Sequence, residues 1–337
     1  NSATVAGGGV YLDESGAALV EDSVQGNQAR DGGGVYLFRS NTARFDTVTI
    51  RGNRADRFGG GLFLSLSNIP LEDHTIQENQ AGVAGGGAYL EESSVSFNRN
   101  LVRNNQAGEQ GGGVAITRNS QADLASNALL ENRAGVTGSG IYVSGSSPTL
   151  VHTTFNRNQG GDGTGLSVAA QAGTPAVVSL VNTIFANHTL AVRASNNATV
   201  TLLATLWDGN GTNFTPGGGV VDPGPTDFNF TGPARFQPDG YHLQRNSVAS
   251  GVGVTTNVGR DIDGDGRPQG SGPDLGADEL PAECAAVATS DLEQVYSSVQ
   301  AAVDAAQPGD EVRISGTCTG APARGALRQT AYIDKQI

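Results

Sequence analysis

Long apolar runs, positive charge and aromatic residues are all scarce in this 337-residue chain, and each scarcity narrows what it can do. Without a long apolar run, the sequence predicts no membrane insertion. The net charge of −13 and the pI near 4.6 argue against nucleic acid and anionic membrane surfaces as partners. Only 6% of residues are aromatic whereas 49 are glycine, a composition typical of a soluble β-rich protein.

Cysteine and methionine are also rare. The two cysteines, Cys284 and Cys318, lie in one C-terminal stretch. Two states stay open for them: in a secreted protein they would pair as a disulfide, and otherwise they are free buried thiols. The chain has no methionine and starts at Asn1 in the middle of a repeat, so we expect a processed or excerpted piece of a longer protein.

A regular repeat dominates what is present. The tripeptide Asn-x-Ala/Gly returns about every 26 residues, a period that indicates a solenoid. Its asparagines are Asn27, Asn53, Asn79, Asn105, Asn132 and Asn158. Looser copies follow at Asn187 and Asn210, and an apolar residue lies three positions before each asparagine, such as Ile184 before Asn187. We expect these apolar residues to form an interior column.

Glycine clusters with the same period each open a short alternating run such as Val35-Tyr36-Leu37, which is typical of a strand. The unit is too short for a βαβ crossover, and the leucine ladder of leucine-rich repeats is missing. The sequence therefore predicts an all-β fold, a parallel β-helix of about eight coils with three short strands each. Equivalent asparagines would then stack at a tight turn and bond the coils above and below, which makes them scaffold and not catalytic residues.

One outward row has the composition of a binding face. If Val10 and Leu12 point inward, the residue between them points outward. The aromatic members of this row are Tyr11, Tyr36, Phe63, Tyr89 and Tyr142. Stacked rings could bind a polysaccharide or a neighbouring rod, or they could only stiffen the sheet. The breaks at Ala115 and Ser167 favour stiffening.

Beyond residues 1–210, which carry the coils, we interpret 211–283 as the end of the solenoid and its cap. This stretch contains Asp261, Asp263 and Asp265 on a glycine-bearing loop. Alternate aspartates of this kind gather oxygen ligands around Ca²⁺, but Gly272 stands where an EF-hand loop has its bidentate glutamate. Calcium and a turn held by aspartates bonded to backbone amides both stay open, and the fold requires no cofactor.

The segment Gly259–Pro268, with Asp274–Glu279, resembles the closing region of bacterial surface β-helix proteins called choice-of-anchor Q proteins. The coils resemble the polymorphic outer-membrane-protein type of repeat. Together the two resemblances cover most of residues 1–280. They imply a right-handed parallel β-helix of the pectin-lyase-like kind that is secreted and placed at the cell surface, and they imply no particular chemistry.

Residues 284–337 differ from the coils. Val295, Val299, Ala302, Val303 and Ala306 share one helical face, after a capping box at 297–300 and before Pro308-Gly309. A strand is expected at 311–314. This pattern resembles the cap with which pectin-lyase-like β-helices begin, so we expect the start of a following unit, with 332–337 as its first stacking strand. Copies would then meet head to tail, or adjoin as units of one longer chain.

Catalytic groups do not cluster in the repeat. The histidines, His74, His152, His188 and His242, occupy different phases, so we expect isolated surface residues that form neither a zinc site nor a base. We therefore predict a non-enzymatic extracellular structural module of a bacterial surface fibre. An adhesin or polysaccharide-binding β-helix is the alternative, followed by a polysaccharide lyase or glycosidase, for which the fold alone argues.

Overall fold

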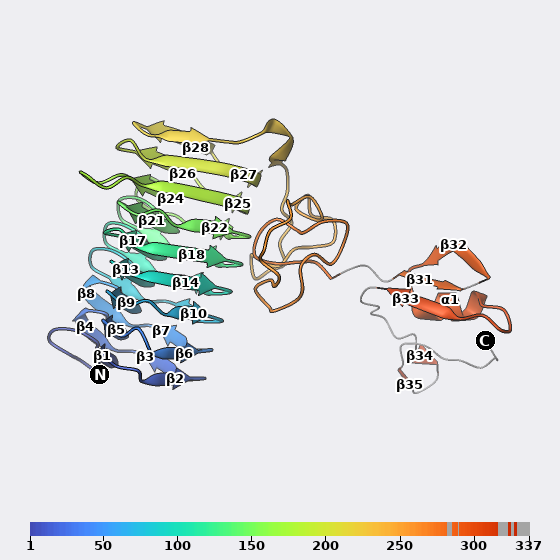
Figure 1. Cartoon of the computed structure of the whole chain (residues 1–337), viewed down its shortest axis with the longest axis horizontal. Coiled ribbons are helices and arrows are strands. Elements are labelled where there is room, and N and C mark those ends of the chain that lie inside the picture. Colours follow the sequence, from blue (N-terminus) through green and yellow to red (C-terminus); the bar gives the residue numbers. More distant parts are fainter. Residues whose placement is uncertain (282–284, 289, 316–322, 325–326, 329–337) are drawn as a thin grey trace. The chain divides into compact units, whose positions relative to one another are not determined.

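The computed structural model describes residues 1–281, 285–288, 290–315, 323–324 and 327–328. They form two compact units, one of Asn1–Arg267 with Gly272–Glu279, and one of Pro268–Ser271 with the described residues from Leu280 onward. The first unit is a parallel β-solenoid whose coils stack from β1 to β28 (Figure 1). The prediction of an all-β parallel β-helix is confirmed, with about nine turns where eight were expected.

The strands of successive coils stack into columns, and the column after the glycine clusters forms a nine-stranded sheet, here called column one. Its strands are β1 (Val10–Asp13), β5 (Val35–Phe38), β9 (Leu62–Ser65), β13 (Ala88–Glu91), β17 (Val114–Thr117), β21 (Ile141–Ser144), β24 (Thr164–Ala169), β26 (Leu190–Ser195) and β28 (Thr212–Gly217).

Columns two and three follow in each coil. Apart from β2 and β6, which form a separate two-stranded sheet, their strands join into one sheet, because two long strands run through both columns. Column two contains β2 (Ala18–Val20), β6 (Arg44–Asp46), β10 (Pro70–Glu72), β14 (Ser94–Asn98), β18 (Gln121–Ala125), β22 (Thr149–Val151) and β29 (Val220–Asp222). Column three contains β3 (Ser23–Gln25), β7 (Thr49–Arg51), β11 (Thr75–Gln77), β15 (Leu101–Arg103), β19 (Ala128–Leu130), β23 (Thr154–Asn156) and β30 (Asn229–Thr231). The shared strands are β25 (Val177–Ala186) and β27 (Thr199–Asp208), and a short 3₁₀ helix, η1 (Thr226–Phe228), precedes β30.

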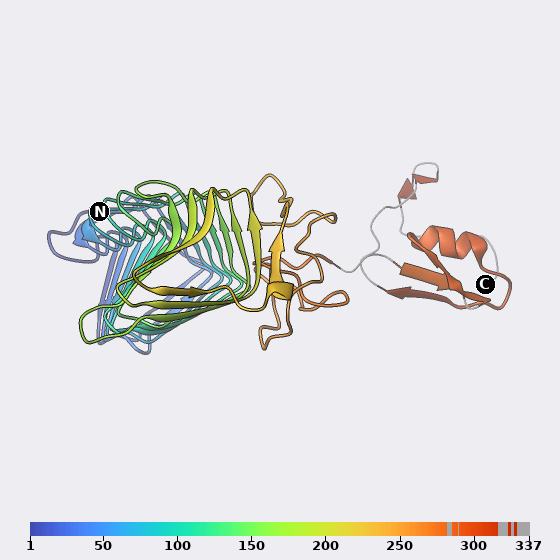
Figure 2. The ribbon, with the colours of Figure 1, turned by 90° about the horizontal axis from the view of Figure 1, so that it is seen from above.

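A fourth, shorter column returns the chain toward the next glycine cluster, so a coil has up to four strands where three were predicted. Its strands are β4 (Gln28–Asp31), β8 (Arg54–Phe58), β12 (Gln80–Ala81), β16 (Gln106–Ala107) and β20 (Arg133–Ala134). Seen along the stack, the columns enclose one continuous interior (Figure 2). Its core is built from side chains such as Val35, Leu37 and Ile50, all with 0% exposure.

The interior apolar column differs from the prediction at one coil. Phe155 pairs in register with Phe185, which pairs with Trp207, so Phe185 and not Ile184 is the interior residue. The cause is that the ladder residue of this coil is His188, three positions after Phe185, while Asn187 is the turn residue before it. Ile184 points outward and is buried there, close to Gly276.

Single residues in the left-handed backbone region turn the chain from one column to the next, and all of them except Glu21 and Gly209 are followed by a buried residue. Between columns two and three these turn residues are Glu21, Thr47, Asp73, Arg99, Ser126, His152, Asn182 and Ala204. Between columns three and four they are Gly26, Gly52, Glu78, Asn104, Glu131, Arg157, Asn187 and Gly209. Asn187 is thus a turn residue, and the buried position that follows it belongs to His188.

The predicted asparagines lie at this second corner and form one hydrogen-bonded ladder. The side-chain oxygen of Asn105, for example, accepts both the backbone N–H and the side-chain amide of Asn79, each at 3.0 Å. The amide of Asn105 donates to the carbonyl of Ile76 and to Asn132. The same bonds recur from Asn27 to Asn158, so every coil is tied to the next.

Serines form a second ladder at the corner between columns one and two. The backbone N–H of Ser67 donates to the hydroxyl of Ser93, and the N–H of Ser93 donates to the hydroxyl of Ser120. A third ladder, at the corner between columns two and three, runs from His74 through Asn100 to Asn127. Each ladder satisfies backbone groups that a turn inside a solenoid leaves unpaired.

The second unit contains a small antiparallel sheet of order β32-β31-β33, made of β32 (Asp291–Tyr296), β31 (Ala285–Ala288) and β33 (Val312–Ser315). The helix α1 (Val299–Ala305) begins at Ser298, whose hydroxyl accepts the N–H of Ala301, one residue later than the predicted capping box starts. The predicted face of α1 is buried at Val299, Ala302 and Val303. The hairpin β31–β32 was not predicted, and a short hairpin, β34 (Ala323–Arg324) and β35 (Leu327–Arg328), completes this unit.

Candidate functional site

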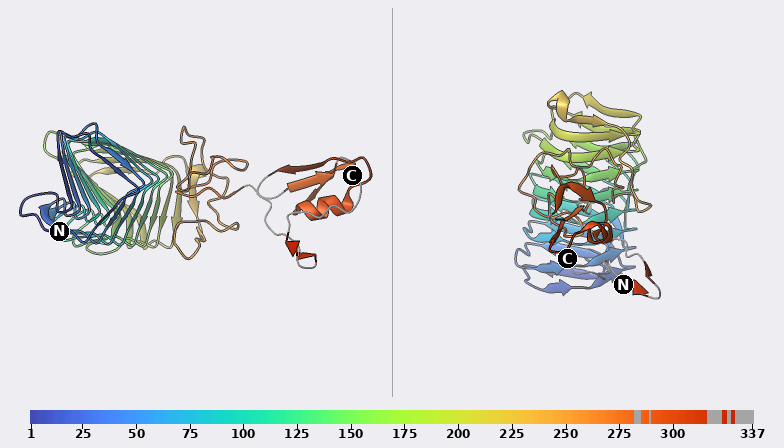
Figure 3. Two further views of the ribbon diagram at one scale, coloured as in Figure 1. Left: turned by 90° about the horizontal axis from the view of Figure 1, so that it is seen from below. Right: turned by 90° about the vertical axis from the view of Figure 1, so that its right-hand side faces the viewer.

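Residues 232–267 and 272–279 contain little regular structure and lie along the side of the solenoid, over column three (Figures 1 and 3). The hydroxyl of Ser126 donates to the carbonyl of Arg260, and the amide of Asn156 donates to the carbonyl of Gly240, both at 2.8 Å. The last coil itself ends with β30. We call residues 232–267 and 272–279 the closing segment, and its lateral position corrects the expectation that this stretch caps the solenoid end.

The outward side chains of column three explain this position. Early coils present polar residues there, such as Gln25 and Arg51, whereas later coils present Ala128 and Leu130, which are buried. Ala277, Tyr241 and Ile262 of the closing segment pack against Leu101, Ala128 and Leu130. An apolar lateral face in mid-solenoid must be covered, and the closing segment covers it.

Asp261 organises the aspartate-rich loop as a turn. One oxygen of its buried carboxylate accepts the backbone N–H groups of Asp263 and Asp265, at 3.0 and 2.7 Å. The other accepts the N–H of Glu279 at 3.1 Å. Both oxygens are therefore committed to backbone amides, which matches the turn interpretation, and the structure does not bring Asp261, Asp263 and Asp265 together as a set of calcium ligands.

A buried ion pair holds the closing segment together. Arg267 and Glu279 lie 2.8 Å apart, and each side chain is 1% exposed. Arg267 also donates to the carbonyls of Gly276 and Ala277, and Glu279 accepts the N–H of Asp274. These contacts connect the two halves of the motif that resembles the choice-of-anchor Q closing region, so its charged residues serve the folding of the segment.

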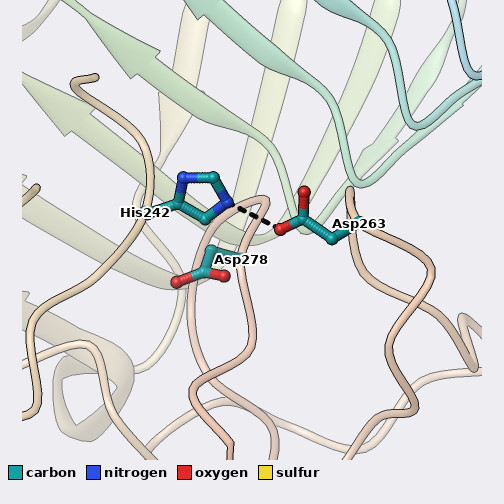
Figure 4. Close-up of side chains that lie close together, drawn as sticks. All are labelled: His242, Asp263 and Asp278. Carbon is teal, nitrogen blue, oxygen red and sulfur yellow. Dashed lines mark hydrogen bonds and ion pairs between the residues drawn. The ribbon is translucent and has the colours of Figure 1, made fainter.

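His242 lies at the centre of a separate polar cluster (Figure 4). Its Nδ1 atom is 2.7 Å from Asp239 and its Nε2 atom is 2.6 Å from Asp263. Asp278 completes the cluster: within the described residues, His242, Asp263 and Asp278 each offer one ligand atom, and these atoms all lie within 4.8 Å of one another. Residues up to 36 positions apart in sequence, from 242 to 278, thus meet in one cluster.

Contacts and burial within the cluster shift the pKa values of His242 and Asp278. The hydrogen bond to Asp263, reinforced by the one to Asp239, raises the pKa of His242 to about 9 although burial opposes this. Burial raises the pKa of Asp278 to about 6. His242 faces the carboxylates of Asp239 and Asp263, and the buried carboxylate of Asp278 is near. In these surroundings the imidazole can keep its proton at neutral pH, or it can bind a cation in place of that proton.

The other three histidines correct the expectation of isolated surface residues. His74, His152 and His188 are 1%, 0% and 3% exposed. Burial lowers their pKa values to about 4, 3 and 4, so they are neutral at pH 7. All three accept hydrogen bonds at solenoid corners. His74 and His188 take positions that asparagines hold in neighbouring coils, whereas His152 is a turn residue equivalent to Ser126 and Asn182.

Four members of the predicted aromatic row are in ring contact. Tyr11 stacks on Tyr36 at 5.4 Å, Tyr36 contacts Phe63 at 4.8 Å, and Phe63 contacts Tyr89 at 4.9 Å. Tyr142 is separated from them by Ala115.

Most of this row is not open to a ligand. Phe63 and Tyr89 are only 5% and 6% exposed, because Phe58, Val83 and Ala84 pack over them. Tyr11, at 50%, is the exposed member. The geometry favours the stiffening role over polysaccharide binding.

Cys284, Cys318 and residues 332–337 lie outside the described residues, so pairing of the cysteines and the last strand stay predictions. Within the described part of the chain, no helix has the length and hydrophobicity of a membrane span.

Comparison with known proteins identifies the fold. The family model for a right-handed β-helix region matches residues 1–137. No curated protein matches the sequence. Among solved structures, the crystal structure of pectate lyase Pel9A is similar with a TM-score of 0.52 and 12% identity, over 82% of this chain and 84% of that chain. At this identity the likeness shows the right-handed parallel β-helix fold alone.

Proposed function

We propose that this right-handed parallel β-helix is a non-enzymatic structural module of a bacterial cell surface, in which the solenoid acts as a stiff rod. The observation that carries the proposal is the ion pairing between charged side chains of successive coils. They pair from one coil to the next, as in Arg51–Glu78, Arg99–Asp73 and Arg193–Asp162. Each ion pair alone contributes little stability. Together with the ladders, the pairs use the polar side chains of one coil to contact the next coil.

The ends of the rod are the contacts we propose for assembly. Among the described residues, β1, β2 and β3 pair on one side only, as do β28, β29 and β30 at the other end. Unpaired strand edges are templates for another chain. A contact between opposite ends is heterologous and builds filaments, or joins adjacent units of one longer chain.

A polysaccharide lyase or glycosidase is the second candidate, favoured by the likeness to pectate lyase and by the cluster around His242. One experiment separates the two. The purified chain is incubated with polygalacturonate, with and without Ca²⁺, and unsaturated products and reducing ends are followed. A structural module releases neither product, whereas product formation that is lost in His242→Ala would overturn the proposal.

Assembly is tested by electron microscopy and sedimentation. We expect fibres that dissociate on a denaturing gel, and we expect Val20→Lys, on the edge strand β2, to shorten them. Val136→Lys is the matched control, because Val136 is similarly exposed, at 52% against 46%, but lies in a loop between coils. Discrete rods at all concentrations would remove the head-to-tail contact while leaving the non-enzymatic role intact.

A further inference from the structure

We propose that His242, Asp263 and Asp278 bind one divalent transition-metal ion, Zn²⁺ by preference, and that Asp239 is the positioning residue of this site. The inference is independent of the proposed structural function. It assigns to the closing segment a metal centre that shares Asp263 with the loop suggested by the sequence but uses neither Asp261 nor Asp265.

The first support is convergence. The three side chains come from separate stretches of the closing segment, yet their ligand atoms all lie within 4.8 Å of one another. Figure 4 shows the carboxylate of Asp263 directed at the ring of His242, with Asp278 beside the same ring. Ligand atoms that each lie about 2 Å from one ion in a tetrahedral site are about 3.3 Å apart, so small side-chain rotations would bring this group to coordination distance.

The second support is the state of Asp278. Its side chain is 6% exposed, and one carboxylate oxygen accepts the N–H of Leu243 at 2.7 Å. The other oxygen accepts no hydrogen bond from the described residues. Burial of a carboxylate is unfavourable unless an opposite charge is near, and a bound cation would supply that charge.

The third support is the orientation of His242. Asp239 faces Nδ1 at 2.7 Å and also accepts the backbone N–H groups of Tyr241 and His242, so the carboxylate is held in place. This leaves Nε2 directed toward Asp263 and Asp278. A carboxylate behind the far nitrogen of a metal-binding histidine fixes its orientation and raises its basicity.

The types of ligand atom indicate which metal ion the site prefers. One imidazole nitrogen with two carboxylates suits Zn²⁺, which takes nitrogen and oxygen ligands in fourfold coordination, better than Ca²⁺, which takes six to eight oxygens. Two aspartates balance the charge of one divalent ion. The side chains of His242 and Asp263 are 29% and 45% exposed, so an ion can enter from solvent, and water can supply the fourth ligand.

The test is isothermal titration of the chelator-treated full chain with zinc chloride, with Co²⁺ absorption as a second readout of coordination. We expect one site per chain. His242→Ala and Asp278→Asn should abolish it, and Asp239→Asn should weaken it about 10–100-fold. Asp278→Asn keeps an oxygen that can accept the N–H of Leu243, so it should fold, which circular dichroism and thermal melting check.

Asp265→Asn is the matched control, because Asp265 is exposed in the same loop but outside the triad. It should bind Zn²⁺ like the parent chain. Three results would overturn the proposal: no Zn²⁺ binding by the parent chain, equal binding by folded Asp278→Asn, or binding of Ca²⁺ alone that Asp265→Asn abolishes.

Discussion

The side-chain amide of Asn158 lies 3.2 Å from Nε2 of His188, which stands one coil further along the corner ladder. On its other side, Nδ1 of His188 lies 3.3 Å from the side-chain oxygen of Asn210. The amide donates to Nε2 and Nδ1 donates to the oxygen, so the ladder requires a neutral ring with its proton on Nδ1. A histidine therefore replaces asparagine only in its neutral form.

Acid should destabilise the solenoid through its buried histidines. The pKa values of His74, His152 and His188 are about 4, 3 and 4 in the folded chain, against about 6.5 when unfolded. The unfolded state therefore binds protons that the folded state excludes, and stability present above pH 6.5 is lost as pH falls toward 4. Each histidine contributes a slope of up to about 1.4 kcal/mol per pH unit. Urea unfolding between pH 7.5 and 4.5 measures the net pH dependence, from which the raised pKa of Asp278 subtracts below about pH 6.

His188→Asn isolates one of these contributions, because asparagine is the residue that the ladder uses in neighbouring coils. The slope of its unfolding free energy against pH should be shallower than that of the parent by about 1.4 kcal/mol per pH unit below pH 6.5. Identical slopes for the two proteins would show that His188 titrates freely in the folded state.

The fold could be predicted because its determinants are local and periodic. Asn27 and its equivalents recur with the length of a coil, and Val35 and Leu37 alternate with outward residues, so spacing alone places them. The serine ladder has the same signal, since Ser67, Ser93 and Ser120 recur at nearly the same interval, and it could have been found in that way. His74 and His188 could not, because they replace asparagine in single coils.

The site around His242 depends on information that spacing does not carry. His242, Asp263 and Asp278 belong to a segment without regular strands, and their meeting depends on how that segment folds on column three. The apolar outward residues Ala128 and Leu130 were a visible signal for that packing. They show that the face is covered, but not which side chains of the covering segment come together.

Asn105→Ala tests the asparagine ladder. The change leaves the N–H of Asn79 and the carbonyl of Ile76 buried without partners, and each such group costs about 1–3 kcal/mol. We expect the free energy of unfolding to fall by about 3 kcal/mol. Gln106→Ala, at the next and exposed position, should change it by less than about 0.5 kcal/mol. Similar losses in the two variants would mean that the ladder contributes little.

Two glycines on the same solenoid should respond differently to alanine. A Cβ at Gly86 would overlap the carbonyl oxygen of Gly112 and the backbone of Gln106 in the next coil, so Gly86→Ala must separate coils that the strands hold together. Gly52 has φ of +62° but open space around it, so Gly52→Ala costs only about 1 kcal/mol of backbone strain. Thermal melting should rank the parent first, Gly52→Ala second and Gly86→Ala clearly last. The reverse order of the two variants would contradict this account of the glycine clusters.

Glu279→Gln tests whether the closing segment folds around its buried ion pair. The change keeps the size of the side chain but removes its charge, which leaves the guanidinium of Arg267 buried without a counter-ion, a loss of about 3–5 kcal/mol. Because the ladders lie in the solenoid, we expect the damage to be local: proteolysis within 232–279 should accelerate while far-UV circular dichroism of the solenoid is retained. Glu109→Gln, the same change at an exposed loop position, should cleave like the parent. Equal protection of the segment in Glu279→Gln and the parent would show that its attachment to column three relies on the apolar contacts of Ala277 and Ile262 instead.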